Sequence, residues 1–155
     1  MFTISYGLYK EYYDDIRFVR NKVFILEQLI PIEIEIDGKD NSCIHFVAYK
    51  SGSPVGTARM GKDGKIGRVA VIKEFRKFGI GKLLMQEIEN VAVAIGINKI
   101  FFNAQLSAKP FYDKIGYKSI GEIFIEANID HIYMEKKLTA QQYDAPEPAT
   151  MVSPA

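Results

Sequence analysis

The sequence has a single cysteine and almost no net charge, and each shortage excludes a class of protein. The single cysteine, Cys43, rules out an intrachain disulfide framework and fits a reducing compartment. The formal net charge of +1 gives no overall attraction to nucleic acid or to an anionic membrane. No N-terminal stretch has the basic start and apolar run of a signal peptide, and no apolar segment could span a bilayer. We therefore expect a soluble cytoplasmic protein with no nucleic-acid or membrane partner.

Hydrophobic residues make up 48% of the 155 residues, which is enough to bury one sizeable core in one domain. We expect that domain at residues 1–138, because the patterned segments end there. The remaining segment, 139–155, has three prolines, little aliphatic content and no periodicity. It is expected to be a flexible C-terminal tail or a segment that wraps the surface.

The most informative stretch of the sequence runs from Lys65 to Ile95. It starts as a β-branched strand, breaks at 73–74, passes through a glycine-containing turn at 76–81 and continues as a helix. The strand, turn and helix in this order predict an anion site at the turn. One face of the helix is apolar at helical spacing apart from a single glutamate: Ile80, Leu83, Leu84, Glu87, Ile88, Val91, Ala92 and Ile95.

The first turn of that helix suits a pyrophosphate. Its backbone N–H groups are free, and the helix macrodipole adds partial positive charge. Gly79 and Gly81 carry no Cβ, so a phosphate could approach closely, and Arg76, Lys77 and Lys82 would add positive charge. The pattern is neither the G-x-G-x-x-G fingerprint nor a P-loop. A strand–helix corner whose glycines only relieve crowding remains an open alternative.

Two motifs in register resemble the GNAT superfamily of acyl-CoA-dependent N-acetyltransferases. Segment 76–81 (RKFGIG) matches its Arg/Gln-x-x-Gly-x-Gly/Ala signature, and segment 68–71 (RVAV) resembles the strand that precedes it. Segment 108–117 (AKPFYDKIGY) resembles the second cofactor motif of the family. The resemblance covers roughly residues 2–138 and is greatest to small stand-alone bacterial members.

The resemblance implies an α/β (α+β) fold with a mixed, mostly antiparallel, six- to seven-stranded sheet and helices on both faces. A parallel central pair, the strands of Val69 and Phe101, would splay apart to admit CoA. Segment 31–38 (PIEIEIDG) alternates strictly but is expected to be irregular, as in the family. Strands are expected at 2–6, 44–50, 55–60, 66–72, 99–104, 117–124 and 131–138, and helices at 10–24, 80–95 and 107–115.

Two groups of charged side chains near the N-terminal helix have alternative interpretations. The cations fit a solvated helix face, with contact to substrate or CoA as the alternative. The acidic residues fit a solvent-facing run or an acidic face that attracts a cationic amine, and with Glu27 they hint weakly at a polycationic or amino-sugar acceptor. The cations are Arg17, Arg20 and Lys22, and the acidic residues are Glu33, Glu35 and Asp37.

By the same resemblance, the chain binds acetyl-CoA and uses no metal. The backbones of Val69 and Val71 would hold the pantetheine arm, and a backbone N–H there would polarise the thioester carbonyl. The amides from Lys77 to Lys82 would bind the pyrophosphate, and Asn103 would hydrogen-bond the cofactor or orient a water. The expected cofactor-binding residues are Val69, Ala70, Val71, Arg76, Lys77, Phe78, Gly79, Ile80, Gly81, Lys82, Asn103, Phe111, Tyr112 and Lys114.

Tyr112 and His131 are the expected catalytic residues. Tyr112 matches the family tyrosine that protonates the departing thiolate, and a phenol with an ordinary pKa of ~10 can do so without being strongly perturbed. His131 lies in a stretch similar to one whose histidine faces the acceptor amine in relatives, although Asp130 stands where they have proline. A purely structural role is the alternative for each.

Two further reactive residues are expected to be structural. Cys43 lies beside an apolar strand and has no nearby base in the sequence. His45 alternates with apolar strand residues, which suits a hydrogen-bonded histidine in a sheet. Two separated histidines and one cysteine do not have the spacing of a zinc site.

The combined prediction is an N-acetyltransferase that transfers an acetyl group directly from acetyl-CoA to a primary amine of a small molecule. One alternative is a GNAT-fold acyl-CoA sensor or partner subunit without catalysis. Another is a nucleotide-binding domain that uses the same helix terminus, against which the Phe111–Tyr112 motif counts. No basic stripe favours a nucleic-acid acceptor. Homodimerisation is common in the family and is neither supported nor excluded by the sequence.

Overall fold

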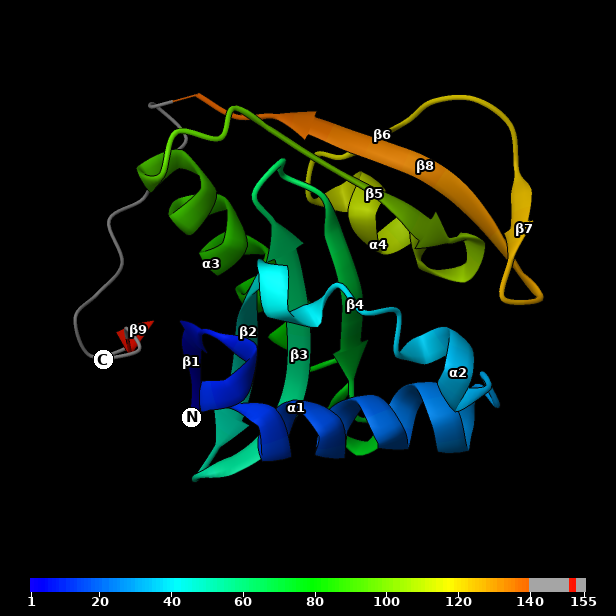
Figure 1. Cartoon of the computed structure of the whole chain (residues 1–155). Coiled ribbons are helices and arrows are strands. Elements are labelled where there is room, and N and C mark those ends of the chain that lie inside the picture. Colours follow the sequence, from blue (N-terminus) through cyan, green and yellow to red (C-terminus); the bar gives the residue numbers. More distant parts are fainter. Residues whose placement is uncertain (140–150, 153–155) are drawn as a thin grey trace.

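The computed structural model describes residues 1–139 and 151–152, in which strands and helices alternate along the chain (Figure 1). The strands are β1 (Phe2–Gly7), β2 (Cys43–Lys50), β3 (Ser53–Gly61), β4 (Ile66–Val71), β5 (Lys99–Gln105), β6 (Lys118–Ser119), β7 (Phe124–Glu126), β8 (Ile129–Lys137) and β9 (Met151–Val152). The α-helices are α1 (Tyr13–Arg20), α2 (Ile32–Glu35), α3 (Ile80–Ala94) and α4 (Lys109–Lys114), and a π-helical segment (Asn21–Glu27) continues α1.

The strands form two sheets. In the first, β1 to β4 are antiparallel in the order β4-β3-β2-β1, and β9 adds to β1 in parallel. In the second, β8 lies between β5 and β6, and its first residues pair with β7. The predicted antiparallel meander of β2, β3 and β4 is confirmed.

The two sheets meet where β4 and β5 begin. One isolated parallel bridge joins Lys65 to Phe101, and the Phe101 N–H donates to the Gly64 carbonyl at 3.2 Å. A Cβ at residue 64 would lie 2.3 Å from the Lys99 carbonyl oxygen, so this close approach requires glycine. Beyond the bridge, the outer edge of β4 has no strand partner among the described residues. The splayed parallel pair expected from the family resemblance is confirmed.

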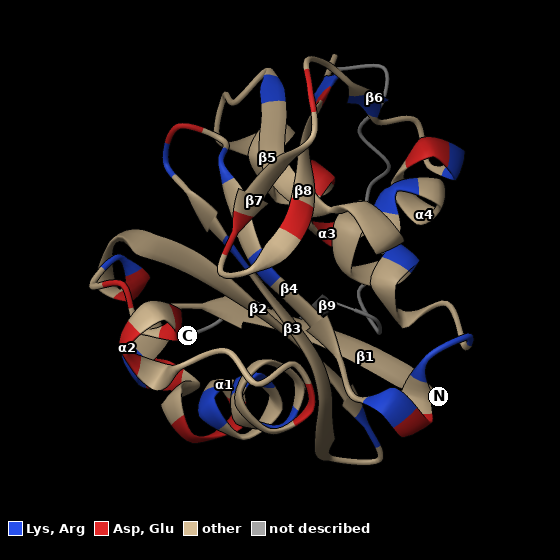
Figure 2. Ribbon diagram, turned by 90° about the vertical axis from the view of Figure 1, so that its right-hand side faces the viewer, with Lys and Arg blue, Asp and Glu red and all other residues tan. Residues whose placement is uncertain are grey.

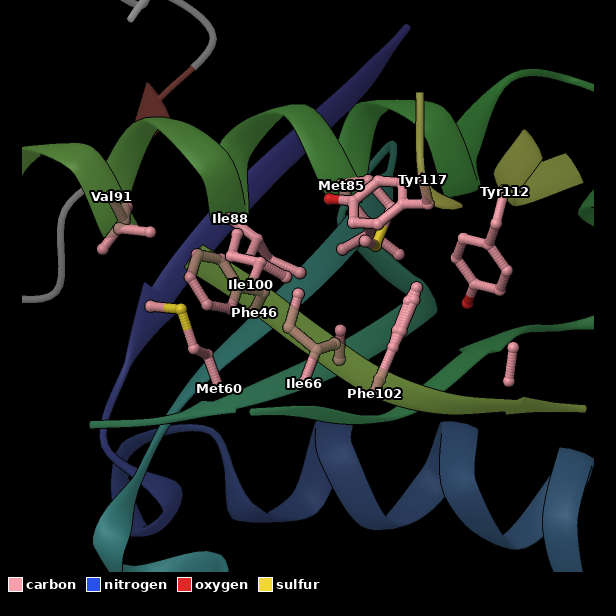
Figure 3. Close-up of a cluster of buried hydrophobic side chains, with 14 of the residues drawn as sticks. Phe46, Met60, Ile66, Met85, Ile88, Val91, Ile100, Phe102, Tyr112 and Tyr117 are labelled. Carbon is pink, nitrogen blue, oxygen red and sulfur yellow. The ribbon is translucent and has the colours of Figure 1, made fainter. Parts of the chain in front are cut away.

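The main hydrophobic core lies between the first sheet and α3 (Figure 3). Alternate residues of β2 and β3, such as Phe46 and Met60, point into it and have no exposed surface. From α3, Leu84 and Ile88 enter the same core and are equally buried, as the predicted helical period requires. The core therefore fixes α3 across the sheet.

The opposite face of the sheet is covered by α1. In Figure 3 the green α3 lies above the strands and the blue α1 below them. A second, smaller hydrophobic cluster on this side joins Val19, Val23 and Phe24 to Ala70 and Ile72 at the end of β4. Helices on both faces, as expected, therefore hold β4 from two sides.

The prediction that segment 31–38 is irregular is wrong for residues 32–35. Ile32–Glu35 forms the one-turn helix α2, and the Pro31 carbonyl accepts from the N–H groups of Ile34 and Glu35. Proline sets its own φ near the helical value and suits this entry. The alternating pattern is misleading because Glu35 turns inward to ion-pair partners, which are described below.

The prediction of a single strand at 117–124 is also wrong. Two separate short strands, β6 and β7, pair with β8 instead. Ala127 and Asn128 form the turn from β7 to β8, with φ values of +51° and +62°, as a two-residue hairpin turn of type I′ requires. His131 consequently lies inside β8, opposite Gln105 of β5 and Phe124 of β7.

The predicted flexible tail is only partly described. Residues 140–150 and 153–155 lie outside the described residues, and the assignment of one domain to residues 1–138 stays a prediction. Met151 and Val152 pair with Ile4 and Ser5 of β1. In the described part of the chain, no helix combines the length and apolarity needed to cross a membrane.

Candidate active site

A cavity of about 800 Å³ opens where β4 and β5 separate. Val69 of β4 and Asn103 of β5 lie on its walls, and Tyr112 of α4 and His131 of β8 also line it. The structure therefore brings four expected site residues, which are far apart in the sequence, into one cavity.

The other expected site residues are not part of this lining. They follow Val69 on β4, form the loop and first turn of α3, or belong to α4: Ala70, Val71, Arg76, Lys77, Phe78, Gly79, Ile80, Gly81, Lys82, Phe111 and Lys114. A ligand that touches both groups must be long enough to run from the cavity along β4 to the start of α3.

β4 carries a bulge beside the cavity. Opposite β3, the register changes between the pairs Thr57–Ala70 and Arg59–Gly67, so β4 has one extra residue. Arg68 in this bulge has a φ of +53°, a strained conformation for a non-glycine residue that costs about 1–3 kcal/mol. Bulges re-aim groups next to active sites. Here the next residue, Val69, is on the cavity wall.

Tyr112 reaches the cavity from α4 and packs its ring 4.5 Å from that of Phe102 (Figure 3). No hydrogen bond among the described residues uses its hydroxyl, and this oxygen is not one of the fully enclosed atoms without a partner. Burial raises the pKa of Tyr112 well above the ordinary phenol value that the sequence led us to expect, so the hydroxyl is protonated at neutral pH but is a weaker acid than expected. The side chain can therefore donate a proton into the cavity.

The hydrogen bonding of His131 leaves its Nε2 as the proton-accepting nitrogen. Its Nδ1 lies 2.7 Å from the Ile129 carbonyl oxygen, and since a carbonyl only accepts, Nδ1 carries the proton. In the neutral ring Nε2 is then the acceptor, and the nearest carboxylate oxygen, of Glu126, is 3.8 Å away. The ring stacks on Phe124 with centroids 6.0 Å apart, which fixes its plane. The geometry suits proton acceptance at Nε2.

The loop before α3 contains two residues in the left-handed region, Lys77 with φ +73° and Gly79 with φ +82°. A Cβ at residue 79 would meet no atom within 4 Å, so the backbone conformation, and not crowding, favours glycine there. At Gly81 the reason is different, because a Cβ would lie 3.1 Å from the ring of Phe111. Crowding thus explains one of the two glycines of the motif and leaves the backbone at Gly79 open.

All three nitrogens of the Arg76 guanidinium donate hydrogen bonds within the protein. Its Nη1 and Nη2 donate to the Glu27 carboxylate at 2.7 and 2.6 Å, and its Nε donates to the Val71 carbonyl at 2.9 Å. Arg76 therefore connects the loop to the end of β4 and to the π-helical segment. Glu27 neutralises its charge, so neither side chain contributes a free charge to a ligand.

A buried arginine–carboxylate cluster lies between α1, α2 and the sheet, beside the cavity. Arg20 has no exposed surface and donates to the carboxylates of Glu35 and Asp40, the latter at 2.7 Å. Arg59 of β3 also donates to Asp40, at 2.8 Å. In Figure 2, blue and red segments gather on α1 and α2. The cluster consists of Arg17, Arg20, Glu35, Asp37, Asp40, Arg59 and Arg68.

This cluster contradicts the solvated interpretation for Arg17, Arg20 and Glu35, whereas Lys22 and Glu33 are exposed as that interpretation expects. Arg17 and Arg20 are buried and do not form a solvated face, and Glu35 is not available to a cationic amine. Burial would raise the pKa of the Glu35 carboxyl, but Arg20 and Arg17 outweigh it and hold that pKa below its ordinary value. The patterns are misleading because buried charges need partners, and Asp40 and Arg59 come from other segments.

Cys43 and His45 have structural surroundings, as expected. Burial raises the pKa of the Cys43 thiol, which is the opposite of activation, although the residue lines the cavity. His45 is fully buried and its Nε2 donates to the Asp40 carbonyl at 2.8 Å, while its Nδ1 has no partner. Within the described residues, no group of three or more His, Cys, Asp or Glu side chains is arranged to hold a metal ion.

The sequence does not single out Gln28 or Gln105 as site residues, although both are on the cavity wall. Their side-chain amides exchange hydrogen bonds of 2.8 and 3.3 Å across the cavity lining. Gln28 carries no signal in the sequence. Gln105 directly follows the predicted strand 99–104, so its position at a strand end was the only available indication.

Comparisons with known proteins identify the family of this chain. Residues 13–138 match the family described as Acetyltransferase (GNAT) domain. The chain is 40% identical over 131 residues to YjcF of Bacillus subtilis, named an uncharacterized N-acetyltransferase, and the match covers 82% of this chain and 94% of that protein.

Two solved structures share the fold. An acyl-CoA N-acyltransferase from Pseudomonas aeruginosa has 26% identity and a TM-score of 0.74, covering 88% of this chain and 98% of that one. Escherichia coli ElaA has 25% identity and a TM-score of 0.77, covering 88% of this chain and 99% of that one. The chain therefore belongs to the GNAT acetyltransferase family, as an N-acetyltransferase of the small bacterial type.

Proposed function

We propose that this enzyme transfers an acetyl group directly from acetyl-CoA to a primary amine of a small molecule. Membership of the GNAT family implies acyl transfer from an acyl-CoA, and the acetyl donor and the amine acceptor are the finer parts of the proposal. The observation that carries it is the meeting of a protonated Tyr112 and a proton-accepting His131 in one cavity between β4 and β5.

The donor would lie along β4. Within residues 1–139 and 151–152 the outer edge of this strand has no strand partner, so the backbone of Val69 and the N–H of Val71 would pair with the pantetheine arm; the Val71 carbonyl already accepts from Arg76. The backbone from Lys77 to Lys82 would bind the pyrophosphate, because the first N–H groups of a helix lack intrahelical acceptors. The open backbone at Gly79 supports this assignment. Since Glu27 neutralises Arg76, the added charge would come from Lys77 and Lys82.

The proposed reaction includes two proton transfers. Nε2 of His131 accepts the proton that the amine loses as its nitrogen bonds to the acyl carbon. The hydroxyl of Tyr112 gives its proton to the sulfur as the carbon–sulfur bond breaks, and a backbone N–H at the β4 bulge stabilises the charge on the acyl oxygen. Acetyl-CoA supplies the activated acyl group, and the products are the acetamide and the free thiol.

The first experiment measures both binding and turnover. Calorimetry with acetyl-CoA tests the donor site, and release of the CoA thiol with a panel of primary amines tests the reaction. Binding together with amine-dependent release is the expected result. Binding without release would identify a sensor, and absence of binding would overturn the donor site.

A pair of tyrosine variants tests the mechanism. Tyr112→Phe should lower kcat by about 10²–10⁴-fold with an acetyl-CoA affinity near that of the wild type. Tyr117→Phe is the matched control from the same aromatic cluster, because its hydroxyl donates to Glu89 at 2.7 Å and serves stability. We expect this control to keep the wild-type kcat. A fully active Tyr112→Phe variant would reject the assignment of the acid.

A further inference from the structure

One guanidinium of the arginine–carboxylate cluster faces the cavity with an incomplete set of partners. Arg68 donates from Nε and Nη2 to the Glu35 carbonyl at 3.2 and 2.9 Å, and its Nη2 lies 3.3 Å from an Asp37 carboxylate oxygen. No hydrogen bond among the described residues uses Nη1, and this atom is not one of the fully enclosed atoms without a partner. Because Arg68 lines the cavity, its Nη1 is accessible to a ligand there.

The cluster also carries more positive than negative charge. Its four arginines face three carboxylates, and the other arginines each hold an ion pair of 2.8 Å or less. Arg68 has the longest pairs, 3.3 Å to Asp37 and 3.6 Å to Glu35. Burial lowers the pKa of Arg68 and the positive charge of Arg59 adds to this effect, as expected for a cation with too little compensation. The excess charge therefore lies on Arg68.

Lysines extend this positive charge around the cavity. Lys39, Lys62 and Lys65 line it, are exposed and form no ion pair within the described residues. Outside the cluster, the acidic residues of the lining are Asp63, which accepts from the Lys65 backbone N–H, and Glu126, beside His131. The wall around Arg68 is therefore predominantly cationic.

We propose that the acceptor amine also carries an anionic group, a carboxylate or a phosphate, which binds to Arg68 with the three lysines around it. This specifies the substrate class and rests on the proposed function. The free Nη1 can donate a charge-assisted hydrogen bond to either kind of anion, and the bonds from Nε and Nη2 to the Glu35 carbonyl hold the guanidinium in place. Of the acidic residues that suggested a cationic acceptor, Glu35 and Asp37 are paired within the cluster, Glu27 is paired with Arg76, and Glu33 is not part of the cavity lining, so we expect the charge preference to be reversed.

The first test compares primary amines of matched chain length that end in a carboxylate, a phosphate, a methyl group or a second amine. The wild type should show a kcat/KM about ten- to a hundredfold higher for one of the anionic amines than for the methyl-terminated amine. The carboxylate and phosphate arms decide which anion is recognised. An equal kcat/KM for the anionic and methyl-terminated amines, or a preference for the diamine, would overturn the proposal.

Variants test whether Arg68 and the lysines cause the preference for an anionic amine. Arg68→Gln should abolish the preference for the anionic amine, and Lys65→Gln, at an exposed position where folding is not at risk, should reduce it. Lys10→Gln is the matched control, because Lys10 is exposed and is not part of the cavity lining. An unchanged preference in both Arg68→Gln and Lys65→Gln would overturn the proposal.

A binding measurement separates this inference from the proposed function, because it needs no turnover. Calorimetry compares an N-acetylated amino carboxylate or aminoalkyl phosphate with a neutral N-alkylacetamide of the same length. Binding of one anionic compound at least about tenfold tighter, lost in Arg68→Gln, would support the anion site even if no amine were acetylated. Equal affinities would overturn it even if the amine chemistry were confirmed.

Discussion

The two faces of the first sheet differ in what joins them to their helices, because the α1 face adds buried ion pairs to its apolar contacts. On the α3 face, Phe46 and Leu84 are apolar and have no exposed surface. On the α1 face, the same strands supply His45 and Arg59, which meet Arg20 of α1 and its carboxylate partners. His45 and Phe46 are adjacent in the sequence but point to opposite faces, because side chains alternate along a strand.

This difference indicates that one face mainly stabilises the fold and the other mainly positions the site. Apolar packing is non-directional and depends mainly on burial and volume, so the α3 face contributes stability. A buried ion pair gains little net stability over well-packed apolar residues, but it is strongly destabilising when one partner is removed. We infer that the charged face chiefly holds α2 and the Arg68 bulge in place beside the cavity.

The largest expected effect is that of acid, which should destabilise the charged contacts of the α1 face and not the apolar contacts of the α3 face. Burial would raise the pKa values of the Glu35, Asp37 and Asp40 carboxyls, but neighbouring arginines outweigh it and hold them below their ordinary values. Their stabilisation is therefore complete above an ordinary carboxyl pKa of about 4 and is lost as the pH falls below it. Burial, with Arg20 and Arg59, lowers the pKa of His45, so stability should already start to fall below about pH 6.5.

Urea unfolding over a pH series measures this acid effect. The unfolding free energy should decrease steadily with falling pH, and Asp40→Asn should make the curve flatter. A wild-type protein whose stability is the same at about pH 7 and about pH 3 would contradict the assignment of the charged face.

The largest effect of a single substitution is expected at Arg20. Arg20→Met should lower the unfolding free energy by about 3–5 kcal/mol, because Glu35 and Asp40 would keep buried charges without their main partner. Lys22→Met is the control, since Lys22 is a neighbouring exposed cation, and its effect should stay within about 0.5 kcal/mol. If the two variants had the same stability, the cluster would not position α2 in the way described.

On the apolar face, Leu84→Ala should lower the unfolding free energy by about 2–5 kcal/mol through lost burial and the cavity left behind. Unlike the Arg20 effect, this loss should be the same at neutral and at mildly acidic pH. Leu26→Ala, at a leucine that is 70% exposed, should cost less than about 0.5 kcal/mol. Chemical denaturation at two pH values checks both, and a pH-dependent Leu84 effect would show that the two faces are not independent.

The packing of the α3 face could be predicted from the sequence and the ion pairs of the α1 face could not, for the same physical reason. The stripe containing Leu84 and Ile88, and the meander of β2 to β4, follow from periods that a short window of sequence contains. Arg20 and Glu35 also have regular spacing with their neighbours, but the period of a charged residue does not reveal whether a partner will bury it. The pairing depends on Asp40 and Arg59, which lie on other elements.

The candidate site divides in the same way. The motif around Gly79 and the tyrosine at 112 are local signals, and each is recognisable from the sequence. The accepting Nε2 of His131 and the exposed Nη1 of Arg68 are not, because they depend on the Ile129 carbonyl and on the Glu35 carbonyl that orient them.

By itself, the sequence determined the helical period of α3, the strands of the β2 to β4 meander and the two cofactor motifs, since these depend on residues close together in the chain. Only the tertiary structure decided that Arg20 is buried, that Arg68 is left with the excess charge, and that Tyr112 and His131 share a cavity. These outcomes depend on the energies of contacts between distant segments, and a buried charge is tolerated only when such a contact provides its partner.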